Sequence, residues 1–247
     1  VNLAGANVGE KRWSNERKKE LVNSRVDTTK NFAELLAEIG QKSPPLYNAS
    51  ALSIYGSQPA VSEKLLPAVD ENTSLDWDHY PDFLTGMCRD SEKAAKSAID
   101  CGVRVTFLRF GVVLASEGGV LPRMVKPFQL FMGGPVGSGH QAFSWITIDD
   151  ALRAIDFLIA NPNVSGPVNL VAPECVTQRQ LAKEIGKVIN RPAVLTMPAP
   201  ILKFILGEMS YLLLEGQCLC PRRLLELGFK FNYPKIEPAL KHILLQL

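Results

Sequence analysis

The clearest strand of this sequence lies at residues 103–114, which read VRVTFLRFGVVL. The segment is almost continuously apolar, a pattern typical of a parallel strand that is covered on both faces. Before it come a charged stretch with helical spacing, residues 15–39, and a strand rich in small residues, residues 46–55. A second helix is predicted at residues 83–99, directly after Asp82, whose side chain is expected to cap it.

The later part of the chain continues this alternation. Short strands are predicted at residues 143–148 and 167–171, and helices at residues 149–159 and 178–189. Strands that alternate with helices indicate a parallel α/β sheet. From residue 191 onward the apolar stretches are interrupted by prolines, which predicts a smaller C-terminal lobe.

The composition limits the classes of function. The chain has 247 residues, 46% of them hydrophobic, and its 27 basic and 25 acidic side chains give a net charge of +2. This balance provides no electrostatic footprint for nucleic acid or anionic lipid, so neither partner is expected. No apolar run reaches the ~18 residues that a membrane span needs. We therefore expect a globular chain that acts on a small molecule.

The five cysteines are few and odd in number, which favours the cytoplasm or another reducing compartment over a disulfide scaffold. Cys218 and Cys220 are the only close pair. A structural zinc site needs four ligands, typically in two spaced pairs, and the other cysteines and the three histidines do not supply that spacing. We therefore predict no metal site.

The first six residues, VNLAGA, are typical of the carboxyl end of a buried strand that runs into a turn of small residues. A chain seldom opens in this way, so we expect the polypeptide to begin upstream of Val1. In open α/β sheets ligands bind at the carboxyl ends of strands. The same residues also fit a tight turn that binds no ligand.

Several stretches of sequence share a pattern with one known family. They are VNLAGA (1–6), KRW (11–13), SRVDTT (24–29), SALSIYG (50–56), DFLTGMCRDSE (82–92), LRFGVVL (108–114), GGPVGSGHQAFSWITIDD (133–150), SGPVNLVAP (165–173) and LLEGQ (213–217). Together they resemble the extended short-chain dehydrogenase/reductase superfamily, and more closely the epimerase-like branch of the NAD-dependent epimerase/dehydratase family. The resemblance covers nearly the whole chain, and the long stretch at 133–150 is its most specific part.

This resemblance implies a Rossmann-like, doubly wound parallel sheet with a smaller C-terminal α+β lobe. It implies that residues 1–165 are the remainder of the dinucleotide-binding domain and that residues 166–247 form a substrate lobe, the two being interleaved. It also implies that the first strands are missing, as one βαβ unit of roughly 50 residues that would carry the glycine-rich turn.

The resemblance further implies a cofactor, NADP, with NAD as the alternative. The residues that it assigns to the cofactor are Leu3, Ala4, Gly5, Glu20, Arg25 and Val113. Glu20 and Arg25 lie on the first helix, where an exposed, solvated charged face is the alternative interpretation. Val113 has a simple core position as its alternative.

Extended members of this superfamily use a Tyr-x-x-x-Lys pair for proton transfer. Alignment on Glu92 places Leu84 at the tyrosine position and Cys88 at the lysine position, and neither can do that work. Tyr80 and Lys93 are thirteen residues apart, so they do not lie on adjacent helical turns. Ordinary dehydrogenase chemistry is therefore in doubt.

Three other side chains are weak catalytic candidates: Ser50, Ser53 and His140. The serines lie near the usual Ser/Thr position, although a hydroxyl that only bonds the backbone is the commoner role. His140 lies in a glycine-rich stretch, residues 133–141, which could present it to a ligand or form a plain surface turn. Phe143 and Trp145 follow it and could stack on a flat or sugar-like ligand.

Two functions remain open at this level. The first is an NADP(H)-dependent oxidoreductase or epimerase that acts on a small carbonyl or sugar-like substrate without the usual Tyr-x-x-x-Lys. The second is a catalytically inert NADP(H)-binding sensor or interaction protein. The fold supports both, because a fold does not fix a function. The oligomeric state is left open.

Overall fold

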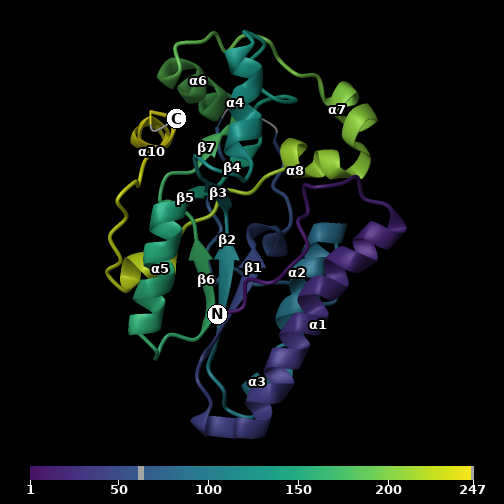
Figure 1. Cartoon of the computed structure of the whole chain (residues 1–247), viewed down its shortest axis with the longest axis vertical. Helices are drawn as coiled ribbons and strands as arrows, with labels where there is room; N and C mark the ends of the chain where they lie inside the picture. Colours follow the sequence, from purple (N-terminus) through teal and green to yellow (C-terminus); the bar gives the residue numbers. More distant parts are fainter. Residues whose placement is uncertain (61–63, 246–247) are drawn as a thin grey trace.

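A parallel sheet at the centre of the molecule is built from the apolar segments of the sequence (Figure 1). In this computed structural model, which describes residues 1–60 and 64–245, strands β1 (Leu46–Ala51), β2 (Val105–Phe110) and β6 (Gly166–Leu170) pair in the order β1-β2-β6. All of these pairs are parallel. Asn2 adds a parallel bridge to Asn48 of β1, as expected for the end of a preceding strand.

Helices cover both faces of the sheet, because successive side chains of a strand point to opposite sides. On one face, Leu46 and Phe107 pack in a cluster with α1 (Asn15–Ile39) and the segment of α3 (Lys96–Asp100). On the other, their neighbours Tyr47 and Leu108 pack with α5 (Ile148–Ala160). Figure 1 shows α1 and α5 on opposite sides of the strands. The predicted α/β Rossmann-like sheet is confirmed.

The long apolar segment at residues 103–114 forms two strands and not one. A Cβ at Gly111 would lie 2.7 Å from a methyl group of Val171 and 2.9 Å from the carbonyl oxygen of Ser144, so the backbones approach too closely for any side chain. After this glycine the chain changes partner, and β3 (Val112–Leu114) pairs in parallel with β5 (Trp145–Thr147).

The predicted helix starts are largely correct. Asp82 caps α2 (Phe83–Lys93) by accepting a hydrogen bond from the backbone N–H of Thr85. The predicted helix at 83–99 is divided, with α3 following after Lys93. Thr147 caps α5 by accepting a hydrogen bond from the backbone N–H of Asp150 at 3.1 Å. The carboxylate of Asp150 accepts the backbone N–H groups of Asn232 and Tyr233, which holds the C-terminal segment.

The later elements build a largely helical C-terminal region. Its core joins helices α4 (Leu121–Gln129), α6 (Gln178–Val188) and α10 (Ile236–Leu244) around Trp145, which is fully buried. The remaining elements are η1 (Gly40–Lys42), η2 (Leu52–Tyr55), β4 (Ala142–Phe143), β7 (Val176–Thr177), α7 (Ala199–Leu206), η3 (Gly207–Ser210), α8 (Tyr211–Leu214) and α9 (Arg222–Glu226). Strand β6 belongs to the central sheet, and the division at residue 165 stays a prediction.

Within the described residues, no helix is both long enough and apolar enough to cross a bilayer.

Candidate functional site

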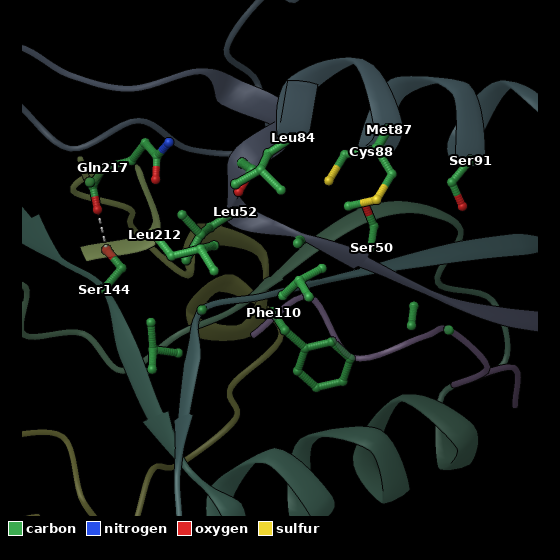
Figure 2. Close-up of a pocket in the computed structure, with 18 of the residues that line it drawn as sticks. Ser50, Leu52, Leu84, Met87, Cys88, Ser91, Phe110, Ser144, Leu212 and Gln217 are labelled. Carbon is green, nitrogen blue, oxygen red and sulfur yellow. Dashed lines mark hydrogen bonds between the residues drawn. The ribbon is translucent and has the colours of Figure 1, made fainter. Parts of the chain in front are cut away.

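The carboxyl ends of the neighbouring parallel strands open into a cavity of about 290 Å³ (Figure 2). Residues 3–5 line it directly after the bridge at Asn2, residues 49–53 line it at the end of β1, and residues 110–112 line it at the end of β2. This edge of an open α/β sheet is where such folds bind ligands.

Helix α2 supplies a second wall. Leu84, Met87, Cys88 and Ser91 recur at helical spacing, so their side chains share the face that lines the cavity. Figure 2 shows these side chains along one side of the helix. Leu84 and Cys88, which the alignment places at the tyrosine and lysine positions, therefore do lie at the cavity. Burial raises the pKa of the Cys88 thiol to about 12, so this group is neutral and supplies no cation.

The C-terminal region supplies the third wall, from Tyr211, Leu212 and residues 215–217, together with residues 142–144. The two segments touch closely, because a Cβ at Gly216 would lie 1.9 Å from the carbonyl oxygen of Ala142. The Ser144 hydroxyl donates to the carbonyl oxygen of Gln217 at 2.8 Å and accepts the N–H of Leu219 at 2.9 Å. Sequence reasoning named Phe143 of this wall but missed Tyr211, Leu212 and residues 215–217. The sequence feature that could have predicted these residues is the LLEGQ stretch at 213–217, which was used only as one of the stretches that resemble the family.

Four of the six predicted cofactor residues line this one cavity: Leu3, Ala4, Gly5 and Arg25. Val113 does not line the cavity, because alternate residues of a strand face opposite sides. The Val113 side chain packs against the core cluster of α5, and Val112 lines the cavity instead. Glu20 is also absent from the lining, and its carboxylate pairs with Arg17 at 2.6 Å. A cofactor contact by Glu20 stays a prediction.

Arg25 is the one lining cation among the described residues of the cavity. Its Nη1 donates to the carbonyl oxygen of Leu21 at 3.1 Å, and no carboxylate pairs with it in the described part of the chain. Burial lowers the pKa of its guanidinium below the ordinary arginine value, but an arginine side chain keeps its charge near neutral pH. A half-buried cation without an anionic partner fits a ligand that brings a phosphate.

The serine candidates both line the cavity. The Ser50 hydroxyl is buried and has no hydrogen-bond partner within the described residues. The backbone carbonyl oxygen of Ser53 accepts hydrogen bonds from the Thr85 hydroxyl and the N–H of Gly56, each at 3.0 Å, which fixes the backbone at this position. Both therefore remain next to any ligand of this cavity.

His140 and the glycine-rich stretch at residues 133–141 are not among the residues that line this cavity, and a ligand contact by His140 stays a prediction. A Cβ at Gly134 would lie 2.2 Å from the carbonyl oxygen of Leu195, so this glycine serves close packing of the chain. Trp145 is fully buried in the core and cannot stack on a ligand, whereas Phe143 does line the cavity. Gln141 ties the stretch to α8 through a bond from Nε2 to the Leu213 carbonyl oxygen at 2.8 Å.

Tyr80 and Lys93 do not lie on adjacent helical turns, since Tyr80 precedes α2, but their side chains meet. Lys93 Nζ donates to the Tyr80 hydroxyl at 2.9 Å, and that hydroxyl donates to Asp90 at 2.7 Å. The ring of Tyr80 packs against Gly86 of α2. The pair is exposed and absent from the cavity lining, so it does not replace the missing catalytic pair.

A buried ion pair joins α2 to β2, next to Ser91 and Phe110, which line the cavity. Arg109 binds both carboxylate oxygens of Glu92, at 2.9 and 2.8 Å, and donates to the Tyr55 hydroxyl at 2.9 Å. Tyr55 donates in turn to Asn169 at 2.8 Å, and burial raises its pKa. Tyr55 thus joins the ion pair to strand β6. In the described part of the chain, no group of three His, Cys, Asp or Glu side chains could hold a metal ion.

A parallel sheet with helices on both faces and a ligand cavity at its strand ends defines a Rossmann-like protein of the α/β class. The chain belongs to the NAD dependent epimerase/dehydratase family, whose model matches residues 1–171. A second model, described as a domain of unknown function (DUF1731), matches residues 197–243, which contain much of the third wall.

Named relatives cover nearly all of the chain. The epimerase family protein SDR39U1 homolog, chloroplastic, of Arabidopsis thaliana is 38% identical over 99% of this chain and 67% of its own length. The epimerase family protein YfhF of Bacillus subtilis is 35% identical over 99% of this chain and 77% of its own.

Solved structures agree with this assignment. The crystal structure of human epimerase family protein SDR39U1 (isoform 2) with NADPH has a TM-score of 0.88 and 31% identity, and covers 100% of this chain and 81% of that chain. UDP-glucuronic acid 4-epimerase from Bacillus cereus has a TM-score of 0.75 at 15% identity over 98% of this chain and 73% of its own. That second likeness shows the shared fold alone.

Proposed function

We propose that this chain binds NADP(H) across its strand ends and uses it in an oxidoreductase or epimerase reaction on a small molecule. The observation that carries the proposal is Arg25, a cavity cation without a carboxylate partner among the described residues. The human relative solved with NADPH supports the choice of cofactor.

The residues present fit a dinucleotide. Ala4 and Gly5 leave room for a ring to approach the backbone, and Arg25 offers a charged group for a phosphate. When bound, NADP(H) supplies hydride transfer, which the side chains of this site cannot provide. The chain's own residues position the partner molecule: Leu84 and Met87 exclude water, and Ser50 offers a hydroxyl next to them.

A second function, an inert NADP(H)-binding sensor, is favoured by one observation. The two positions that carry the catalytic tyrosine and lysine in extended relatives are occupied here by Leu84 and a neutral Cys88. Turnover of bound NADPH with a panel of carbonyl compounds favours the enzyme, whereas binding without turnover favours the sensor.

The test of cofactor binding is a fluorescence titration of the full chain with NADPH and, separately, with NADH. We expect Arg25→Leu to weaken NADPH binding by at least about tenfold, because a hydrogen bond to a charged group is lost. Arg104→Leu is the matched control, since the Arg104 side chain is exposed and donates to Asn163 at 3.3 Å. Equal NADPH affinity in wild type and Arg25→Leu would contradict the proposal. Tighter binding of NADH than of NADPH would show that the cofactor is NAD(H).

A further inference from the structure

Two buried polar atoms of the cavity wall lack a hydrogen-bond partner within the described residues. They are the side-chain carbonyl oxygen of Gln217 and the hydroxyl oxygen of Ser50. Gln217 is only 3% exposed, and Figure 2 draws both side chains among those that line the cavity. A buried polar group in a native structure is normally paired, so an unpaired one in a cavity marks a place where a ligand completes the bonding.

The position of Gln217 is set by its backbone and not by the ligand. The Ser144 hydroxyl donates to the backbone carbonyl oxygen of Gln217. Gln58 bonds the residues on either side: its side-chain oxygen accepts the N–H of Cys218 at 2.7 Å, and its backbone N–H donates to the carbonyl oxygen of Gly216 at 2.9 Å. The backbone from which this side chain extends is therefore fixed before a ligand arrives. Because a carbonyl oxygen only accepts hydrogen bonds, the ligand must supply an O–H or N–H group.

The charges of the cavity argue against a second phosphorylated ligand. Apart from Arg25, no lysine or arginine lines the cavity in the described part of the chain, and the one acidic lining residue, Glu215, lies on the same wall as Gln217. A nucleoside diphosphate sugar would need cations of its own and would meet the carboxylate of Glu215 instead. The surrounding side chains are mainly apolar: Val8, Leu52, Leu84, Met87, Phe110 and Leu212.

We propose that the second ligand of this cavity is a neutral, largely apolar alcohol that donates its hydroxyl to Gln217, with Ser50 as a second polar contact. Gln217 is then a specificity-determining residue, and nucleoside diphosphate sugars are excluded. This inference rests on the proposed function, because it assigns Arg25 to the dinucleotide.

The experiment is calorimetric titration of the full chain, with and without saturating NADP⁺, using cyclohexanol, benzyl alcohol, menthol and UDP-glucose as probes. We expect at least one alcohol to bind and UDP-glucose not to bind. Gln217→Leu should weaken binding of that alcohol about five- to tenfold, as the loss of one hydrogen bond predicts, and Ser50→Ala should weaken it less. Gln129→Leu, the same change at an exposed position of α4, should have no effect.

Three results would overturn the inference: binding of UDP-glucose more tightly than any of the alcohols, binding of none of the alcohols, or unchanged alcohol affinity in Gln217→Leu. A failure of the proposed function is seen separately, as the absence of NADPH binding in the fluorescence titration. Circular dichroism of each variant confirms that the altered chain is folded.

Discussion

Glu71 shows how a single buried carboxylate can connect distant segments. One of its oxygens accepts the backbone N–H of Asn169 in β6 at 2.9 Å and that of Arg223 in α9 at 3.4 Å. Its other oxygen is buried without a partner in the described residues. Burial raises the pKa of this carboxyl above its usual value, and the backbone bonds only partly oppose this effect.

The sign of the pH dependence follows from this shift. Because folding raises the pKa of Glu71, the folded chain binds its proton more tightly than the unfolded chain, so this group costs stability above its folded pKa. That cost disappears as the pH falls toward the usual glutamate pKa. We expect Glu71→Gln, which keeps the accepting oxygen, to be at least as stable as wild type at pH 7 and to lose this part of the pH dependence.

Urea unfolding between pH 4 and pH 8 measures this effect. Glu237→Gln is the matched control with the opposite sign, because the hydrogen bond from Lys241 lowers the pKa of Glu237. Its contribution is present above the usual glutamate pKa and is lost as the pH falls. A Glu71→Gln chain that is less stable than wild type at pH 7 would show that the ionised carboxylate is favourable here.

The first turn of helix α2 connects the sheet to the third wall of the cavity, the C-terminal wall. Asp82 caps the helix by accepting the N–H of Thr85 at 2.9 Å and accepts the hydroxyl of Tyr211 at 3.0 Å. Burial raises the pKa of Tyr211 to about 12, so its phenol keeps the proton that it donates to Asp82. One side chain thus stabilises both the helix and its contact with α8.

Removal of this cap is expected to cost more than an ordinary surface change. We expect Asp82→Ala to lower the free energy of unfolding by about 1–2 kcal/mol, since an N-cap bond and the contact with Tyr211 are both lost. Thermal and urea unfolding measure the loss. Asp78→Ala, at an exposed position just before the helix, should change stability by less than about 0.5 kcal/mol. Equal losses in the two variants would refute this role of Asp82.

At the level of elements, the sequence predicts what local patterns encode. The first helix matches its prediction at residues 15–39, because its cap at Ser14 and its apolar spacing are local features. The break of the long strand at Gly111 could not be predicted in this way, since it depends on how closely Val171 and Ser144 approach. For the same reason the close packing of Gly134 against Leu195 could not be predicted from the sequence.

The same limit applies to the candidate site of the whole molecule. Residues 3–5 and Arg25 could be predicted, because the end of a strand and the resemblance to a family both point to them. Tyr211 and Gln217 could not, since only the fold brings them to the strand ends. The meeting of Tyr80 with Lys93 was missed in the same way, because helical spacing says nothing of a residue that precedes the helix.

Gly216 is the point at which the C-terminal wall joins the rest of the molecule. A Cβ there would lie 1.9 Å from the carbonyl oxygen of Ala142, which is backbone and cannot turn aside. We expect Gly216→Ala to displace residues 215–217, to destabilise the chain by about 1–3 kcal/mol as overpacking does, and to weaken binding in the cavity. Gly9→Ala, where the nearest atom would be 3.7 Å away, is the matched control.

Unfolding curves and NADPH titration of both variants test this expectation. Wild-type stability and affinity in Gly216→Ala would mean that the two segments can separate without consequence for the site.

The bond between Gln58 and Cys218 joins residues 160 positions apart. A nascent polypeptide leaving the ribosome therefore has its strand-end residues long before it has the opposite wall, and a ligand can be enclosed only after residues 211–217 have been made. A premature stop codon anywhere before position 217 would leave the apolar lining of the half-built site open to water. Such a truncated product should be removed by proteolysis and should not persist as a partly active form.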